Sequence, residues 1–156
     1  MNHDKKKVEA IVLWGKANRG KTQTLNLVAN LLEYDFNSNS KKSFLFPHSI
    51  SDDKSIAIDV NGKKVGIITA GDSVKELTQG LNSLPNDCDL YICSSHTKGK
   101  TCNYLKNRFN NAILWISKWT IKDENDKVDF KENFFKNKAN LIRAQEIVEI
   151  IKELLG

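Results

Sequence analysis

The amino-acid sequence predicts an α/β fold in which helices cover both faces of a mostly parallel β-sheet with one antiparallel edge strand. Two patterns carry this prediction. Apolar runs of strand length alternate with stretches of helical periodicity, as in successive βαβ units. An Asn-Gly dipeptide joins two strand-like runs at 55–60 and 63–69, which is a strong hairpin signal. Right-handed crossovers between the parallel strands would then give three layers.

The expected elements follow in a simple order. The apolar run 8–14 is typical of a buried parallel strand, and apolar residues at helical spacing follow it over 21–33. After the hairpin, the sequence predicts a helix from Ser73 to about Leu84, a strand over 87–94, a helix over 102–109, a strand over 112–117 and a closing helix over 139–155.

The length of 156 residues predicts a single domain over 1–156 with a core of its own. No apolar run approaches the ~20 residues of a membrane span, and no apolar signal segment follows the basic N-terminal cluster. We therefore expect a cytoplasmic protein without membrane contact. The three cysteines, Cys88, Cys93 and Cys102, form no CxxC pair, which favours reduced structural thiols over a disulfide or a zinc site.

The net charge of +5 allows a basic surface to attract nucleotides or nucleic acid. A solvated, lysine-coated surface is the simpler interpretation, because the sequence contains no RNA- or DNA-binding motif. Nucleic acid therefore stays a partner that no motif supports.

Residues Gly15 to Thr22 read GKANRGKT, which is the pattern of a phosphate-binding loop. Gly15 and Gly20 let the backbone N–H groups turn inward around a phosphate. Lys21 supplies positive charge to the β- and γ-phosphates, and Thr22 offers a hydroxyl to Mg²⁺. The first turn of the following helix adds its positive dipole end. The residues expected to contact the nucleotide here are Gly15, Lys16, Ala17, Asn18, Arg19, Gly20, Lys21, Thr22 and Gln23.

With a strand before this loop and a helix after it, the chain resembles the P-loop NTPase superfamily. The resemblance is specific over 8–33, and beyond these residues it is one of topology, similar to the core of small GTPase-like domains. It implies a three-layer P-loop NTPase fold and Mg²⁺-dependent binding of a nucleoside triphosphate, ATP or GTP.

In such sheets the ligand lies beyond the carboxyl ends of the strands. The loops expected to converge there are 15–22, 69–73, 94–101 and 117–120. Asp72 is the candidate that would hold the metal or orient a water, and with Lys21 it makes up the expected catalytic pair. P-loop enzymes typically place an acid directly after a strand, whereas Asp72 comes three residues late. Capping of the helix that starts at Ser73 is the alternative role for this region.

The loop 94–101 offers further polar groups. Lys98 or Lys100 can neutralise charge on a transferring phosphoryl group, and His96 can orient a nucleophile. The alternative is a surface loop with Thr101 as the cap of the next helix.

Lys16 matches the signature lysine of MinD/ParA-like ATPases, which acts across a dimer. Ala17 and Asn18 replace the two glycines of that family's loop, so an exposed lysine is the simpler account. We also expect Lys21 to face solvent when the site is empty.

Three functions fit these features. The first is a nucleoside triphosphatase that switches its loops and a protein partner. ATP is favoured over GTP, because residues 117–120 lack the Asn or Thr and the Asp of an N/TKxD motif. The second is a kinase that transfers the γ-phosphoryl to a small molecule or nucleotide, although the chain has only three arginines, Arg19, Arg108 and Arg143. The third is a slow or non-hydrolysing regulatory module, which the missing strand-end acid favours.

Overall fold

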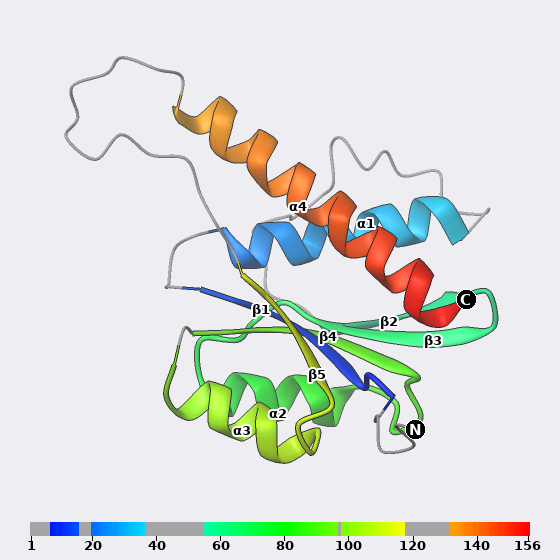
Figure 1. Cartoon of the computed structure of the whole chain (residues 1–156), viewed down its shortest axis with the longest axis vertical. Coiled ribbons are helices and arrows are strands. Elements are labelled where there is room, and N and C mark those ends of the chain that lie inside the picture. Colours follow the sequence, from blue (N-terminus) through cyan, green and yellow to red (C-terminus); the bar gives the residue numbers. More distant parts are fainter. Residues whose placement is uncertain (1–6, 16–19, 37–54, 97, 118–131) are drawn as a thin grey trace, which may run out of the picture.

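The computed structural model describes residues 7–15, 20–36, 55–96, 98–117 and 132–156, with backbone alone for 132–136. Strands and helices alternate along this described part of the chain (Figure 1). They are β1 (Ala10–Trp14), α1 (Lys21–Phe36), β2 (Ser55–Val60), β3 (Lys63–Ile68), α2 (Val74–Ser83), β4 (Leu90–Ser95), α3 (Lys100–Arg108), β5 (Ile113–Ser117) and α4 (Glu132–Leu155).

The described strands form one sheet in the order β2-β3-β4-β1-β5. β1 runs parallel to both of its neighbours, β4 and β5, and β3 runs parallel to β4. Only β2, at one edge, is antiparallel to its neighbour β3. The expected mostly parallel sheet with one antiparallel edge strand is therefore confirmed. The four parallel strands end at a common edge, where the loops that follow them meet.

The hairpin between β2 and β3 turns on Asn61 and Gly62, whose φ angles are 53° and 81°. Positive φ at both central residues is the type I′ geometry that an Asn-Gly dipeptide favours. The turn lies at the end of β3 opposite to its carboxyl end, so it has no part in the edge where the loops converge.

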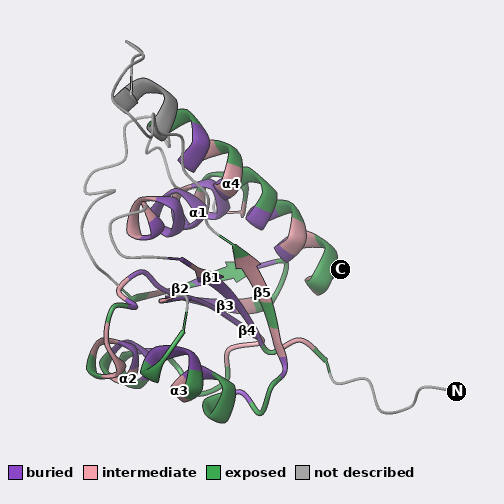
Figure 2. Cartoon of the chain, turned by 60° about the vertical axis from the view of Figure 1, so that its left-hand side comes forward, coloured by how far each residue is buried: buried purple, intermediate pink, exposed green. Residues whose placement is uncertain are grey.

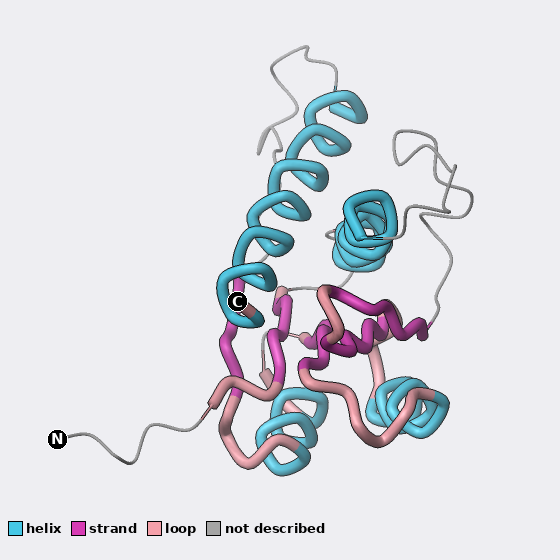
Figure 3. Tube along the Cα trace, turned by 90° about the vertical axis from the view of Figure 1, so that its right-hand side faces the viewer, coloured by secondary structure: helices cyan, strands magenta, loops and turns pink. Residues whose placement is uncertain are grey.

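Helices cover both faces of the sheet, α1 and α4 on one and α2 and α3 on the other (Figures 1 and 3). Each face has its own apolar core. Along β1, Ile11 and Leu13 belong to the core beneath α1 and α4, whereas Ala10 and Val12 belong to the core above α2 and α3. The twofold alternation of a strand thus serves two apolar layers, which confirms the three-layer α/β arrangement.

α1 is buried along most of its length, because it lies between the sheet and α4 (Figure 2). α4 covers it with a stripe of buried residues that includes Ala144, Ile147 and Ile151. Of the described helices, none combines the length and the apolar composition that crossing a lipid bilayer requires.

Three helix boundaries differ from expectation. α4 begins at Glu132 rather than at 139. α1 continues to Phe36 rather than ending at 33. α3 begins at Lys100 with Gly99, at φ 100°, as its N-cap. Thr101 therefore lies inside α3, so the alternative in which it caps this helix is wrong.

Candidate functional site

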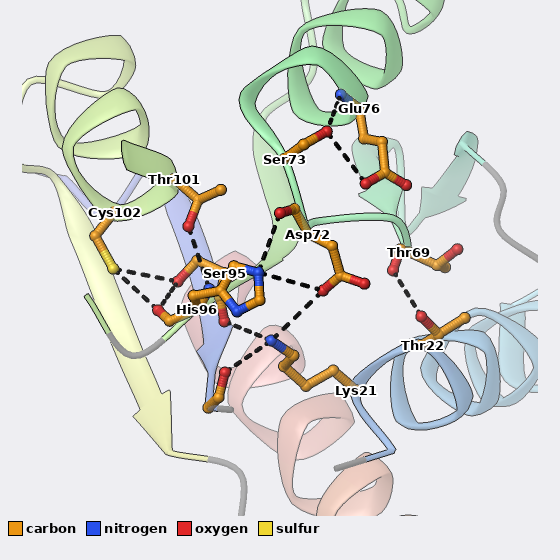
Figure 4. A network of polar contacts seen from close by, with 11 residues as sticks. Lys21, Thr22, Thr69, Asp72, Ser73, Glu76, Ser95, His96, Thr101 and Cys102 are labelled. Carbon is orange, nitrogen blue, oxygen red and sulfur yellow. Dashed lines mark hydrogen bonds and ion pairs between the residues drawn. The ribbon is translucent and has the colours of Figure 1, made fainter. Parts of the chain in front are cut away.

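Lys21 is the first residue of α1, and only 5% of it is exposed. Its Nζ donates hydrogen bonds of 2.8 Å to the backbone oxygens of Gly15 and Ser95 (Figure 4). Gly15 N also donates to Ser95 O, at 3.2 Å. The lysine therefore joins the carboxyl ends of β1 and β4 and ties the start of α1 to the residue at which the phosphate-loop pattern begins.

The expectation that Lys21 faces solvent is wrong. The backbone oxygens of Gly15 and Ser95 lie at the ends of β1 and β4, and the ammonium turns inward because it donates to both of them. Burial lowers the pKa of Lys21 below its ordinary value of 10.5, and the negative charge of Asp72 opposes this change.

Asp72 lies beyond the carboxyl end of β3, and 64% of its side chain is exposed. Its Oδ1 is 4.0 Å from Nζ of Lys21 and 3.8 Å from Nε2 of His96 (Figure 4). The His96 ring nitrogen also lies 3.0 Å from the backbone oxygen of Asp72. The carboxylate thus approaches the only lysine of the phosphate-loop pattern whose side chain the structure describes.

Helix capping at this point belongs to Ser73. Its Oγ accepts a 3.1 Å hydrogen bond from the Glu76 backbone N–H, and it lies 3.2 Å from Glu76 Oε1. The Asp72 carboxylate is not needed for the cap of α2, so the capping role weighed from the sequence belongs to Ser73.

Gly71 fixes the position of this loop. A Cβ at Gly71 would overlap the backbone carbonyl of Ser94 in β4. The absence of a side chain lets the β3–α2 connection lie directly against β4, beside the residue whose oxygen accepts from Lys21. This close approach brings Asp72 to the lysine.

Thr22 follows Lys21, and its Oγ1 donates a 3.2 Å hydrogen bond to the backbone oxygen of Thr69 (Figure 4). Its hydroxyl thus lies at the end of β3. The described residues contain no group of three or more His, Cys, Asp or Glu side chains that would cage an ion. Magnesium in nucleotide sites usually needs only one or two carboxylates together with phosphate oxygens and water. A hydroxyl and one nearby carboxylate fit such an ion better than a protein-caged one.

The first turn of α3 holds the loop after β4. The backbone N–H of His96 donates to Thr101 Oγ1 at 3.2 Å, and Cys102 Sγ donates to His96 O at 3.0 Å. Cys102 Sγ also lies 3.6 Å from Ser95 Oγ. These bonds fix the direction in which the His96 ring approaches Asp72.

Asn140 of α4 contacts the first turn of α1. Its Nδ2 donates to Gln23 Oε1 at 2.9 Å, and its Oδ1 lies 3.4 Å from Thr24 Oγ1. Gly20 has φ +82°, and the Asn140 amide fills the space that a Cβ there would need. The sequence analysis missed Asn140. The signal was a polar residue at the helical spacing of Ala144, Ile147 and Ile151, on a stripe that is otherwise apolar.

The structure brings Gly15, Lys21 and Asp72 together. Thr22 lies beside them at the end of β3, whereas Gly20 and Gln23 contact Asn140. Lys98 lines a neighbouring cavity instead of joining this network. The other candidates, Lys16, Ala17, Asn18, Arg19 and residues 118–120, lie outside the described residues.

Comparison of the chain with protein-family models, with curated proteins and with solved structures finds no match.

Proposed function

We propose that this chain is a P-loop domain that binds and hydrolyses a Mg²⁺-bound nucleoside triphosphate, with ATP favoured, in the cytoplasm. One observation carries the proposal. The Lys21 ammonium is bonded to the Gly15 oxygen, so it links the first turn of α1 to the residue that follows β1. A cation thus lies close to the positive end of a 16-residue helix, a combination that suits a polyphosphate.

In this proposal, Lys21 exchanges one or both of its carbonyl partners for phosphate oxygens. Phosphate oxygens compete with these carbonyls for the ammonium, because the phosphate oxygens carry negative charge and the carbonyls do not. Backbone N–H groups at the start of α1 hold the other phosphate oxygens. Mg²⁺ bound with the nucleotide neutralises phosphate charge. Thr22 offers its hydroxyl to the ion, and Asp72 holds a water next to it or orients the attacking one.

The test compares wild type, Lys21→Ala and the control Lys75→Ala, an exposed lysine on α2. We expect Lys21→Ala to lower the affinity for Mg²⁺-ATP by about tenfold or more, as loss of a charge-assisted phosphate contact should. Lys75→Ala should bind as wild type does. Calorimetry measures the affinity and circular dichroism checks the fold. A folded Lys21→Ala protein with unchanged ATP and GTP affinity would refute the site.

A specific feature also favours a second candidate, a nucleotide-binding module that hydrolyses slowly or not at all. β3 runs directly into Thr69 and β4 into His96, so neither strand end carries the acid that usually assists hydrolysis. Among the acidic residues that the structure describes, Asp72 is the one in contact with Lys21, and it lies 4.0 Å from the lysine Nζ.

The fate of γ-labelled ATP separates these candidates. Release of labelled phosphate in wild type, but not in Lys21→Ala, supports the triphosphatase. Label that stays on bound ATP supports the non-hydrolysing module. Label that moves to an added nucleoside, nucleotide or other hydroxyl compound would establish a kinase instead.

A further inference from the structure

A cavity of about 400 Å³ lies between α3 and the strands β1 and β5, beside the candidate site. Its lining includes two tryptophans and two lysines, together with Cys102 and Asn103. The tryptophans are Trp14 and Trp115, and the lysines are Lys98 and Lys106. Pockets of this size take small organic ligands.

The two tryptophans face the cavity because of the register of the sheet. Trp115 lies opposite Val12, and Trp14 lies two residues further along β1, opposite Ser117. Alternation along the strands therefore directs Val12, Trp14 and Trp115 to the face covered by α2 and α3. Both indoles are only partly buried, so aromatic surface remains open to a ligand.

The charged residues that the structure describes on the lining of this cavity, Lys98 and Lys106, are both positive. The stretch 98–117 contains Lys98, Lys100, Lys106 and Arg108 and no acidic residue. The Lys106 ammonium lies 5.9 Å from the centre of the Trp115 ring, so a cation and an aromatic face are presented together. An anion that carries a flat ring matches both features.

Two residues on the wall of the cavity adjoin the candidate site. Trp14 directly precedes Gly15, whose oxygen accepts from Lys21. Cys102 donates to the backbone oxygen of His96, whose ring approaches Asp72. A ligand in the cavity would therefore contact residues that are next to those bonded to Lys21 and Asp72.

We propose that the cavity between α3 and β5 binds the nucleobase of a nucleotide, stacked on the tryptophans, with Lys98 and Lys106 drawing its phosphate. The base has two sources. It is either the base of the triphosphate held at Lys21 or the base of a separate nucleotide. In the first case the inference rests on the proposed function, and in the second case it does not.

The test uses three probes: AMP or GMP, which carry a base and one phosphate; ATP; and Mg²⁺-tripolyphosphate, which has no base. Calorimetry compares wild type with Trp115→Leu and Lys106→Gln. The matched controls are Leu114→Ala, on the opposite face of β5, and Lys75→Gln on α2. Lys21→Ala monitors the phosphate site separately.

We expect Trp115→Leu to lower the affinity for a base-bearing probe by about tenfold, as loss of one base–aromatic stack should. The affinity for tripolyphosphate should stay unchanged. Lys106→Gln should lower the affinity for the monophosphates by about threefold, as loss of one exposed cation does. Both control variants should bind as wild type does.

The two sources give different stoichiometries. If the base belongs to the triphosphate, AMP or GMP competes with ATP and one nucleotide binds per chain. If the nucleotide is separate, the monophosphate binds to the ATP-loaded protein and two nucleotides bind per chain.

The inference is overturned if Trp115→Leu and Lys106→Gln bind both the monophosphates and ATP with the affinity of wild type. It is also overturned if the affinity for tripolyphosphate falls as much as the affinity for the base-bearing probes. Lys106 is exposed, so its variant decides the question should Trp115→Leu fail to fold. Failure of tripolyphosphate to bind wild type would count against the proposed function alone.

Discussion

The Lys21 ammonium and the Asp72 carboxylate lie 4.0 Å apart, although the lysine is 5% and the aspartate 64% exposed. The positive charge is thus held inside by two backbone oxygens, whereas its partner remains at the surface. The carboxylate lies close enough to Lys21 to repel an anion that approaches the lysine, unless a cation arrives as well. This arrangement favours a ligand that carries its own divalent ion.

The lowered pKa of Lys21 makes a contribution to stability that depends on pH. The folded chain binds the Lys21 proton more weakly than the unfolded chain does. The unfolding free energy therefore rises with pH between the lowered pKa and 10.5, and it is constant above 10.5. We expect the unfolding free energy of wild type, relative to Lys21→Met, to rise over this window. Denaturant titrations at several pH values measure it, with Lys75→Met as the control. A flat or falling difference would contradict the burial of the charged lysine.

Asp72 and Ser73 should separate function from stability. Ser73→Ala removes the cap of α2 and should cost about 1 kcal/mol of unfolding free energy without altering turnover. Asp72→Asn should change stability by less than about 1 kcal/mol, because the pair is partly exposed. It should lower turnover and shift its magnesium dependence. If Asp72→Asn turns over nucleotide as wild type does, its carboxylate has no role in the chemistry.

Gly71→Ala should disturb the site by steric overlap. The added methyl meets the Ser94 backbone, which cannot yield as a flexible side chain would, so we expect a loss of about 1–3 kcal/mol and weaker triphosphate binding. Gly62→Ala is the matched control. Its Cβ is unobstructed but φ is +81°, so about 1 kcal/mol of stability should be lost while binding is retained. Equal binding by both variants would show that Gly71 does not position Asp72.

Cys93 should resist thiol reagents until the protein unfolds. Burial raises its pKa to about 12, and only the thiolate reacts. At pH 8, mass spectrometry after alkylation should find the half-buried Cys88 modified before Cys93. In denaturant all thiols should react. Rapid native labelling of Cys93 would indicate that β4 opens readily at the centre of the sheet.

Local patterns predicted most of the fold. The apolar run before the loop, the Asn61-Gly62 turn and the Ser73 cap each depend on neighbours within a few residues, and all three are found. The sequence also predicted that the loops at 15–22, 69–73 and 94–101 converge, because parallel strands end at one edge.

Contacts between distant residues were not predictable. Lys21 turns inward because of Ser95 O, 74 residues away, and this partner depends on β4 being the neighbour of β1. No local pattern specifies that strand order. Asn140 reaches Gln23 across 117 residues, and only its place on an apolar stripe hinted at a role. The placement of Trp14 and Trp115 on the same face of the sheet likewise depends on the register between β1 and β5.

The bond between Asn140 and Gln23 joins α4 to the first turn of α1, and the 3.0 Å ion pair between Lys152 and Asp35 joins the two helices at their other ends. A ligand that moves the start of α1 would therefore move α1 and α4 as one body. From Asn140 to Leu155 α4 extends roughly 22 Å, so a joint rotation of about 10° displaces its far end by about 4 Å. Spin labels on α2 and at Leu154 would detect this as a distance change on adding Mg²⁺-ATP, absent in Asn140→Ala; an unchanged distance would mean that α4 acts only as a cover for α1.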